Sequence, residues 1–321
     1  MNFNVLNSFF SQCINGFNNA WYPSDFAPLS NIQAPDLVFS GDDSIKTDVL
    51  LRWASWFFQS MCLIDSFDEL SKPQIISRVR DGISCFGVSL SQPDKDKISI
   101  LIANFLYNQS KNSLERKRQK LTERKRQEII AVKSGVNKVV SCWVCGHRFD
   151  DDVVQRFLIS RKVKPALPDF VDVLTPRGLV DRDLDIEVEH KIPFSKGGGD
   201  LDDINNIDIS CGWCNKGKSN YLSIYDANSK PKIYFNKDVN FKISVPQPYW
   251  AIRKLAYNNK CSHPNCVNEN GLRISLINLK GAATPLNIKV VCKEHDDLRD
   301  IRLVPRLNYK SCIIKHPGNY W

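Results

Sequence analysis

Two pairs of cysteines with identical spacing constrain this chain more than any other feature. They are Cys142-x-x-Cys145 and Cys211-x-x-Cys214. Each pair places two thiolates within reach of one tetrahedral ion, and two such pairs complete a closed shell of four sulfur ligands. A single CxxC also fits a redox motif or chance, but two of them, each with a glycine nearby, favour a structural Zn²⁺ that joins two distant pieces of chain.

A second candidate zinc site lies further along the chain, where Cys261-x4-Cys266 is followed by Cys292-x-x-His295. His263 is a competing ligand inside its first loop, and Cys312 with His316 forms a weaker alternative pair. His147, just after the first CxxC, is expected to be a structural or surface residue, because four cysteines leave it no position on the metal. The predicted ligands of the second Zn²⁺ are Cys261, Cys266, Cys292 and His295.

Composition sets the surroundings in which these cysteines act. The 321 residues are 42% hydrophobic and 25% charged, and the net charge of +9 suits a polyanionic partner without requiring one. The first residues lack the charged start and apolar stretch of a signal peptide, and no apolar run approaches the roughly 20 residues that span a bilayer. We therefore expect a cytoplasmic protein with no membrane contact, in which thiols stay reduced.

The chain divides into three predicted domains of an α+β protein. Residues 1–135 are predicted to form a helical N-terminal domain that ends in a long basic helix. Residues 136–222 hold the central motif with its four-cysteine site. Residues 223–321 are rich in short strand patterns such as KIYFN, FKISV and LNIKVVC, and are predicted to form a small mixed accessory module with the second zinc site.

The N-terminal domain contains three predicted helices. One is capped by Asp43 or Ser44 and runs through apolar positions to Met61; it is too apolar for a surface helix, so a core or an interface is expected. Another follows Pro73. The third runs from Pro93 towards Lys133 and contains ERKRQ at 115–119 and again at 123–127, which gives either a solvated connector or a basic arm on a nucleic-acid backbone.

The central motif lies between the two CxxC pairs. Residues 185–190, DIEVEH, alternate between polar and apolar and predict a strand. Pro193 and the run Gly197–Gly199 then predict a loop. Ile207 and Ile209 predict a short second strand that leads into Cys211, and a helix is expected around Asn215.

At this point the residues resemble a known family. The pattern E-H-x-I-P-x-S-x-G-G-G, then N-N-I, then C-x-x-C-N-x-x-K looks like the HNH nucleases, closest to the zinc-stapled members among restriction and homing enzymes. The resemblance covers residues 141–221. It implies a ββα-metal core of two strands, a loop and a helix around one divalent ion.

The resemblance also implies roles for individual residues. His190 matches the general base that activates water, and Glu189 matches the acidic metal ligand beside it, although that ligand is more often Asp. Asn206 matches the middle Asn, which orients the catalytic histidine or approaches the metal. Asn215 matches the helix residue that binds the metal. Lys218 matches a lysine that contacts phosphate, and the nucleic-acid contacts predicted overall are Lys191, Lys196, Lys216 and Lys218.

The chemistry agrees with that assignment. Hydrolysis of a phosphodiester builds negative charge on the phosphate and on the departing oxygen, which one hard cation held by oxygen ligands can neutralise. Mg²⁺ or Mn²⁺ is expected, since such ions keep several waters and need few protein ligands. A neutral imidazole can accept a proton from water near neutral pH. The insertion from Phe149 to Asp183 is either a further DNA contact or a packed surface excursion; its basic residues are Arg156, Arg161, Lys162, Lys164 and Arg177.

Several functions remain open from the sequence. The leading hypothesis is an endonuclease acting on double-stranded DNA in bacterial or phage restriction or defence, as a homodimer or with a defence-system partner protein. A homing endonuclease is an alternative. The alternative of another class is a non-catalytic zinc protein that binds nucleic acid or protein through a degenerate HNH core.

Overall fold

A computed structural model describes residues 3–18, 32–39, 43–62, 70–86, 90–114, 119–134, 139–159, 164–196, 198–227 and 230–315. The chain forms two compact units, 1–47 and 48–321. The first holds α1 (Phe3–Asn18), the 3₁₀ helix η2 (Asp36–Phe39) and the start of α3 (Asp43–Met61). No helix in the described ranges combines the length and the apolar character that crossing a membrane requires. The predicted boundaries at 135 and 222 stay a prediction.

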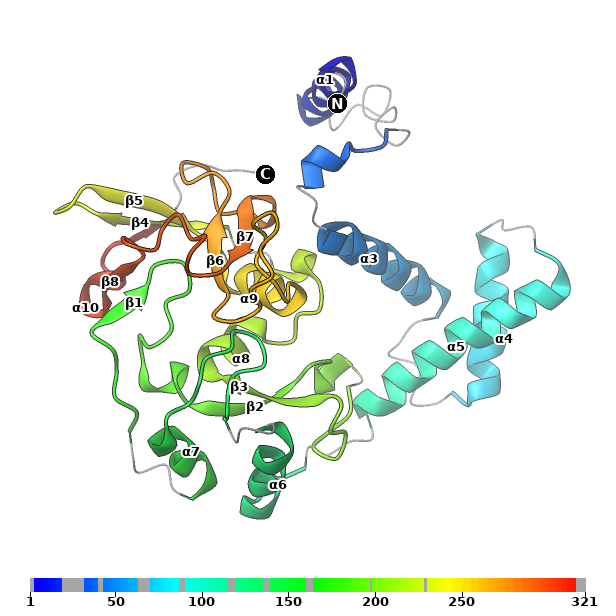
Figure 1. The fold of residues 1–321 in the computed structure, drawn as a ribbon. Helices are drawn as coiled ribbons and strands as arrows, with labels where there is room; N and C mark the ends of the chain where they lie inside the picture. The colour runs from blue at the N-terminus through cyan, green and yellow to red at the C-terminus, as the bar shows by residue number, and fades with distance from the viewer. Residues whose placement is uncertain are drawn as a thin grey trace. The chain divides into compact units, whose positions relative to one another are not determined.

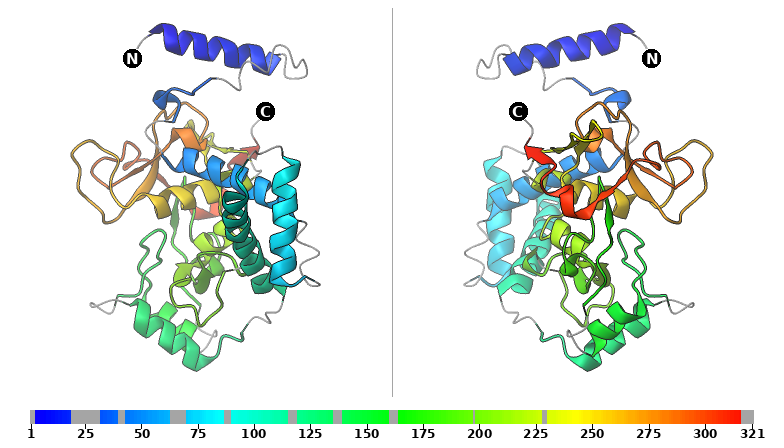
Figure 2. Two further views of the ribbon diagram at one scale, coloured as in Figure 1. Left: turned by 90° about the vertical axis from the view of Figure 1, so that its right-hand side faces the viewer. Right: turned by 90° about the vertical axis from the view of Figure 1, so that its left-hand side faces the viewer.

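A small helical cluster forms the early part of the second unit. α4 (Lys72–Cys85) begins one residue before Pro73, which lies in its first turn, and packs against α5 (Gln92–Leu114), as Figures 1 and 2 show. Its buried apolar positions recur every three or four residues, which places them on one helix face. The cluster is formed by Met61, Cys62, Ile75, Val79, Ile83, Ile102, Ala103 and Leu106.

The helix α3 confirms the predicted span but not a buried core position for all its aromatic residues. Trp53 and Trp56 are 57% and 56% exposed. Its polar side is instead the anchored one: Asp48 is fully buried and accepts hydrogen bonds from Ile224 N at 2.8 Å and from Arg253 Nη2 at 2.7 Å. Buried carboxylates need such partners, so Asp48 anchors α3 to Ile224 and Arg253.

The predicted long basic helix is wrong as a single element. α5 ends at Leu114, residues 119–122 are not helical, and α6 (Glu123–Lys133) starts anew. Thr122 has an extended backbone, and its side chain accepts a hydrogen bond from Lys125 N at 3.2 Å, which is the geometry of a helix N-cap. Most of the first ERKRQ copy, 115–118, lies outside the described residues; the second copy forms the first turns of α6.

Four small antiparallel sheets make up the β structure of the described residues. β2 (Ile186–His190) pairs with β3 (Ile207–Cys211), and β1 (Phe170–Asp172) pairs with β8 (Leu303–Pro305). β4 (Lys232–Asn236) lies between β5 (Phe241–Val245) and β9 (Ile313–Lys315), and β6 (Arg273–Leu276) pairs with β7 (Ile288–Val291). The remaining helices are α7 (Asp151–Leu158), α8 (Gly212–Lys218), α9 (Pro248–Tyr257) and the short α10 (Arg306–Tyr309).

The main hydrophobic core draws residues from α6 and from both of the later predicted domains, 136–222 and 223–321. It contains Ile129 of α6, Ile207 and Ile209 of β3, Tyr234 of β4, and residues as late as Tyr309. Tyr309 donates its hydroxyl hydrogen to the carbonyl of Val173 at 3.1 Å. Burial of many large apolar side chains is the main stabilising contribution in such a core. The ββα segment therefore depends for its packing on residues beyond 222.

Candidate active site and cysteine clusters

The hairpin β2–β3 and the helix α8 position the candidate catalytic residues. The strands are in register with Glu189 opposite Asp208 and His190 opposite Ile207. α8 begins directly after β3 and lies beside both strands (Figure 1). Because side chains alternate along a strand, Glu187 and Glu189 point to one side of β2 and His190 to the other.

Glu189 forms a buried ion pair with the helix. Its side chain is 5% exposed, and Lys218 Nζ lies 2.7 Å from Glu189 Oε1. The same ammonium donates to the carbonyl of His190 at 2.7 Å. Lys218 is itself buried, so in this arrangement its charge faces the strand end that carries Glu189 and His190. In this structure Lys218 therefore pairs with Glu189, the predicted metal ligand, and its ammonium is not exposed for a contact with phosphate.

Asn215 lies one helical turn before Lys218 and contacts the other acidic residue of the strand. Its amide nitrogen donates to Glu187. Glu187 also accepts a hydrogen bond from Arg182 Nε at 2.7 Å. The two residues that the sequence assigned to a divalent ion, Glu189 and Asn215, thus lie along one strand–helix contact with Glu187 beside them. Glu187 was missed from the sequence, although its spacing of two from Glu189 is the signal that could have found it.

His190 contacts an acidic residue that sequence reasoning also missed. Its Nε2 lies 3.3 Å from Asp200 Oδ1, and its ring meets that of Phe194 edge-on with 6.1 Å between centroids. Partial burial raises the pKa of Asp200, but hydrogen bonds from the backbone N–H of Gln119 and from His190 outweigh that effect and hold it below the usual value.

The side chain of Asn206 holds the backbone of the loop between β2 and β3. Its Oδ1 accepts from Ile192 N at 2.8 Å, and its Nδ2 donates to the carbonyls of Ile192 at 3.0 Å and Gly199 at 2.9 Å. Gly198 follows the same loop so closely that a Cβ there would lie 1.9 Å from the Ile192 oxygen. Asn206 therefore shapes the loop between the strands, and any orientation of His190 by this residue acts through the loop.

The first cysteine cluster closes the base of the hairpin. The sulfurs of Cys142, Cys145, Cys211 and Cys214 all lie within 4.8 Å of one another. Hydrogen bonds from the other three thiols and the charge of Arg177 hold the pKa of Cys145 well below its usual value. Arg177 Nη1 lies 2.9 Å from the Cys145 sulfur. Four sulfurs at this separation, with a cation beside them, fit a tetrahedral Zn²⁺.

His147 lies outside this cluster, as expected. Its ring packs edge-on against Phe149 at 5.4 Å, and burial together with Arg177 lowers its pKa to about 4. A histidine held neutral by burial is a packing residue here.

The second cluster brings together the four predicted ligands. Cys261, Cys266, Cys292 and His295 offer ligand atoms within 4.8 Å of one another. Cys292 Sγ lies 3.2 Å from His295 Nδ1. His263, the competing ligand, stacks on the His295 ring at 3.8 Å between centroids instead. Cys312 packs against the main core, and His316 lies outside the described residues.

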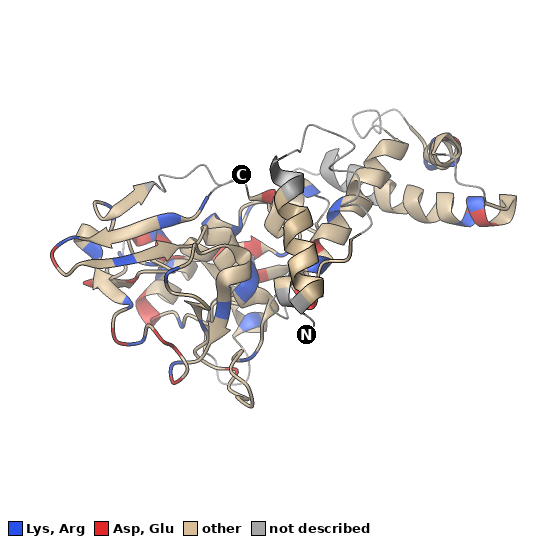
Figure 3. Ribbon diagram, turned by 90° about the horizontal axis from the view of Figure 1, so that it is seen from above, with Lys and Arg blue, Asp and Glu red and all other residues tan. Residues whose placement is uncertain are grey.

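The basic residues near the hairpin fall into two kinds. Lys191 and Lys196 are partly exposed and pair with Asp208 at 3.0 Å and Asp226 at 3.2 Å, whereas Lys216 is exposed. Along the described ribbon in Figure 3, positions of Lys and Arg are interleaved with those of Asp and Glu. Lys191, Lys196 and Lys216 thus offer local cationic groups near the hairpin.

A pocket of about 590 Å³ lies beside Glu187 and Asn215. Three arginines line it: Arg126 of α6, Arg156 of α7 and Arg182. Arg156 pairs with Asp185 at 2.8 Å and Arg182 with Glu187. The Nε of Arg126 is buried without a hydrogen-bond partner among the described residues. Of the other basic residues predicted in the insertion, Arg177 serves the cysteine cluster, and Arg161 and Lys162 lie outside the described ranges.

Two antiparallel strands and a following helix, closed at the base by four cysteines and carrying a histidine at a strand end, define the class of cysteine-braced ββα domains. The family model of the HNH endonuclease matches residues 178–221, which include β2, β3 and α8. The suspected HNH relationship is confirmed for this segment, and the chain contains an HNH domain. No curated protein and no solved structure matches the chain.

Proposed function

We propose that the chain is a metal-dependent endonuclease that hydrolyses phosphodiester bonds of double-stranded DNA, with His190 as the general base. The observation that carries this proposal is the position of His190 in the HNH-matching segment. It lies at the end of β2, one residue after Glu189 in sequence, and its ring contacts the carboxylate of Asp200. An imidazole held by a carboxylate can accept the proton of the attacking water when a phosphodiester is hydrolysed.

The side chains on the α8 side of β2 fit a hard divalent ion. Glu187, Glu189 and Asn215 offer carboxylate and amide oxygens, the donors that Mg²⁺ and Mn²⁺ prefer. Glu189 already holds a cation there, since the Lys218 ammonium lies 2.7 Å from its oxygen. Among the described residues, the two cysteine clusters are the only groups of three or more His, Cys, Asp or Glu ligands. The ion would therefore take few protein ligands and, when bound, would neutralise charge on the phosphate.

The protein's own groups have separate tasks in this proposal. His190 accepts a proton from the attacking water, and Asn206 keeps the loop beside it in shape. Arg126 and Lys216 attract the backbone of DNA, with Lys191 and Lys196 at the edge of the site. Zn²⁺ in each cysteine cluster is structural, because four ligands leave no open position for a substrate.

The biological setting that fits best is bacterial or phage restriction or defence in the cytoplasm. A cut through both strands requires two single HNH sites, which a homodimer supplies. The exposed tryptophans of α3, Trp53 and Trp56, would serve a defence-system partner or a second copy. A homing endonuclease would use the same chemistry with a different target.

One observation favours the non-catalytic alternative. The buried pair of Lys218 with Glu189 already balances the charge of the carboxylate without a divalent ion. A zinc protein that binds nucleic acid through this surface would keep both cysteine clusters and the same fold.

Cleavage assays on paired histidine variants separate the two functions. Wild-type protein should convert supercoiled DNA to nicked or linear forms with Mg²⁺ or Mn²⁺, and His190→Ala should lose at least about 10²-fold in rate, the contribution of a general base. His147→Gln, which alters a histidine outside both clusters, is the matched control and keeps cleavage. Zinc content should be equal in all three. Binding of DNA without cleavage by any of them would establish the alternative.

A further inference from the structure

Asp200 occupies a position between the catalytic histidine and a distant part of the chain. Its Oδ1 lies 3.3 Å from His190 Nε2, and its Oδ2 accepts a hydrogen bond from the backbone N–H of Gln119 at 2.7 Å. The side chains of His190 and Asp200 are only 14% and 12% exposed. Both carboxylate oxygens are therefore engaged, one by the histidine and one by the segment before α6.

The loop that carries Asp200 is held from inside. Asn206 donates to the carbonyl of Gly199, the residue immediately before Asp200. At Gly199 a Cβ would lie 2.3 Å from that of Asp203, so the loop packs on itself without space for a side chain there. A carboxylate on such a loop has few alternative positions, which is what a group that orients another side chain requires.

The segment 119–133 holds the same loop from outside. The side chain of Gln119 bonds to Asp202, and Lys125 Nζ lies 2.9 Å from Asp202 Oδ1. Lys133 Nζ donates to the carbonyl of Ile204 at 3.0 Å. Two lysines of the predicted basic arm thus contact the loop next to the active site, and the contacts extend from Asp200 to Ile204.

We propose that Asp200 is the positioning residue of His190, and that the Gln119 backbone fixes Asp200 in that role. The proposal rests on the proposed nuclease function. A carboxylate beside Nε2 favours the tautomer with hydrogen on Nε2, which leaves Nδ1 as the nitrogen that accepts a proton from water. In this arrangement a residue from the segment that joins α5 to α6 completes the active site of the HNH domain.

Two neighbouring acids on the loop allow a matched test in the full-length, zinc-loaded protein. Asp200→Asn removes the charge beside His190, and Asp202→Asn removes a charge that contacts the same Gln119 but not His190. With Asp200→Asn, kcat on plasmid DNA should fall on the order of 10²-fold while KM changes less than about threefold. Asp202→Asn should leave kcat within about threefold of wild type. Equal losses in both variants, or an unchanged kcat in Asp200→Asn, would overturn the positioning role.

A spectroscopic measurement tests Asp200 independently of cleavage. The chain has five histidines, so the ¹⁵N signals of the His190 ring can be assigned by difference from His190→Ala. Wild type should show the tautomer with hydrogen on Nε2, and Asp200→Asn should shift toward a mixture while the His147 signals stay in place. The opposite tautomer in wild type, or identical spectra in both proteins, refutes the proposal. The expected spectra with no cleavage by wild type would reject the nuclease function and retain the contact that orients His190.

Discussion

The two cysteine clusters use the same kind of ligands for different purposes. In the first, Cys145 and Cys211 are 66 positions apart, and its sulfurs belong to the main core together with β3 and α8. In the second, Cys266 and Cys292 are 26 positions apart, and the cysteines belong to a separate small cluster with Val291 and Leu272. The first cluster therefore joins residues 142–145 to the end of β3 and to α8 in the main core, and the second belongs to a neighbouring module.

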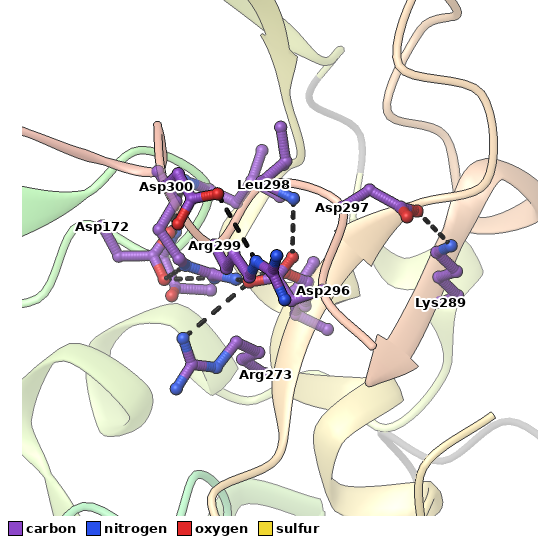
Figure 4. Close-up of polar contacts among 12 residues, drawn as sticks. Asp172, Arg273, Lys289, Asp296, Asp297, Leu298, Arg299 and Asp300 are labelled. Atoms are coloured by element: carbon purple, nitrogen blue, oxygen red, sulfur yellow. Dashed lines mark hydrogen bonds and ion pairs between the residues drawn. The ribbon is translucent and has the colours of Figure 1, made fainter. Parts of the chain in front are cut away.

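The second cluster reaches the rest of the unit through Leu272, which packs against both hydrophobic clusters, and through ionic contacts. Asp296, next to the candidate ligand His295, is fully buried and pairs with Arg302, which also pairs with Asp172 of β1. Figure 4 shows Asp172, Asp296 and Arg273 close together. Arg273 approaches Asp296 at 3.8 Å. The first cluster thus supports the hairpin directly, whereas the second cluster supports it only through intermediate residues such as Asp296 and Arg302.

The largest effect is expected from breaking the first cluster. Cys214→Ser removes a ligand inside α8, so the Zn²⁺ that joins the helix to the residue 142–145 turn should be lost and the hairpin should lose its fixed geometry. We expect zinc content to fall by one ion per chain and DNA cleavage to disappear. Metal analysis with a plasmid assay measures both. Cys85→Ser, at an exposed cysteine of α4, is the control and should behave as wild type; full cleavage by Cys214→Ser would contradict the proposed role.

Breaking the second cluster should have a smaller effect on activity. Cys292→Ser should also lose one Zn²⁺, but the first cluster still closes the hairpin, so we expect cleavage to persist at a rate reduced less than about tenfold. Hydrogen exchange should rise in residues 261–295 and stay low in β2 and β3, because unfolding is local. If exchange rises equally in both regions, the two clusters form one cooperative unit and the comparison fails.

Removing the ionic partners of Asp296, which are Arg302 and Arg273, should have the smallest effects, and these are expected on stability. Arg302→Met leaves the fully buried Asp296 without its nearest cation, which costs on the order of 3 kcal/mol of stability. Arg273→Met removes a longer contact of a side chain that is 30% exposed, which costs less than about 1 kcal/mol. Urea unfolding of both variants provides the comparison. Equal losses would mean that Asp296 does not depend mainly on Arg302.

Much of the fold around the clusters was predictable because the signals are local in sequence. The spacing of two CxxC pairs determined the first cluster, and the alternation from Ile186 to His190 predicted β2 within one residue. The short apolar pattern of Ile207 and Ile209 likewise predicted β3. In each case the deciding contacts lie within a few residues, where the period of a strand or the reach of a thiolate sets the answer.

The rest of the site depends on contacts that sequence spacing does not encode. The break before α6 arises where Thr122 caps a new helix and Gln119 bonds to Asp200, 81 positions later. Helix propensities depend on nearby residues, so they can indicate the cap at Thr122 but not the hydrogen bond between Gln119 and Asp200. Lys218 was expected to face phosphate, but packing of α8 on β2 directs its ammonium at Glu189. Both features depend on tertiary contacts, and both involve residues close to the proposed active site.

The pairing of β1 with β8 also has a consequence for synthesis of the chain. Val171 lies opposite Val304, so a strand inside the insertion of the first cluster waits for a partner made much later. Chains emerge from the ribosome from the N-terminus, and packing follows emergence. The main core, which extends to Tyr309, therefore closes only when nearly all of these residues have been translated. A product interrupted before that point would carry the HNH motif but not the core that holds its hairpin rigid.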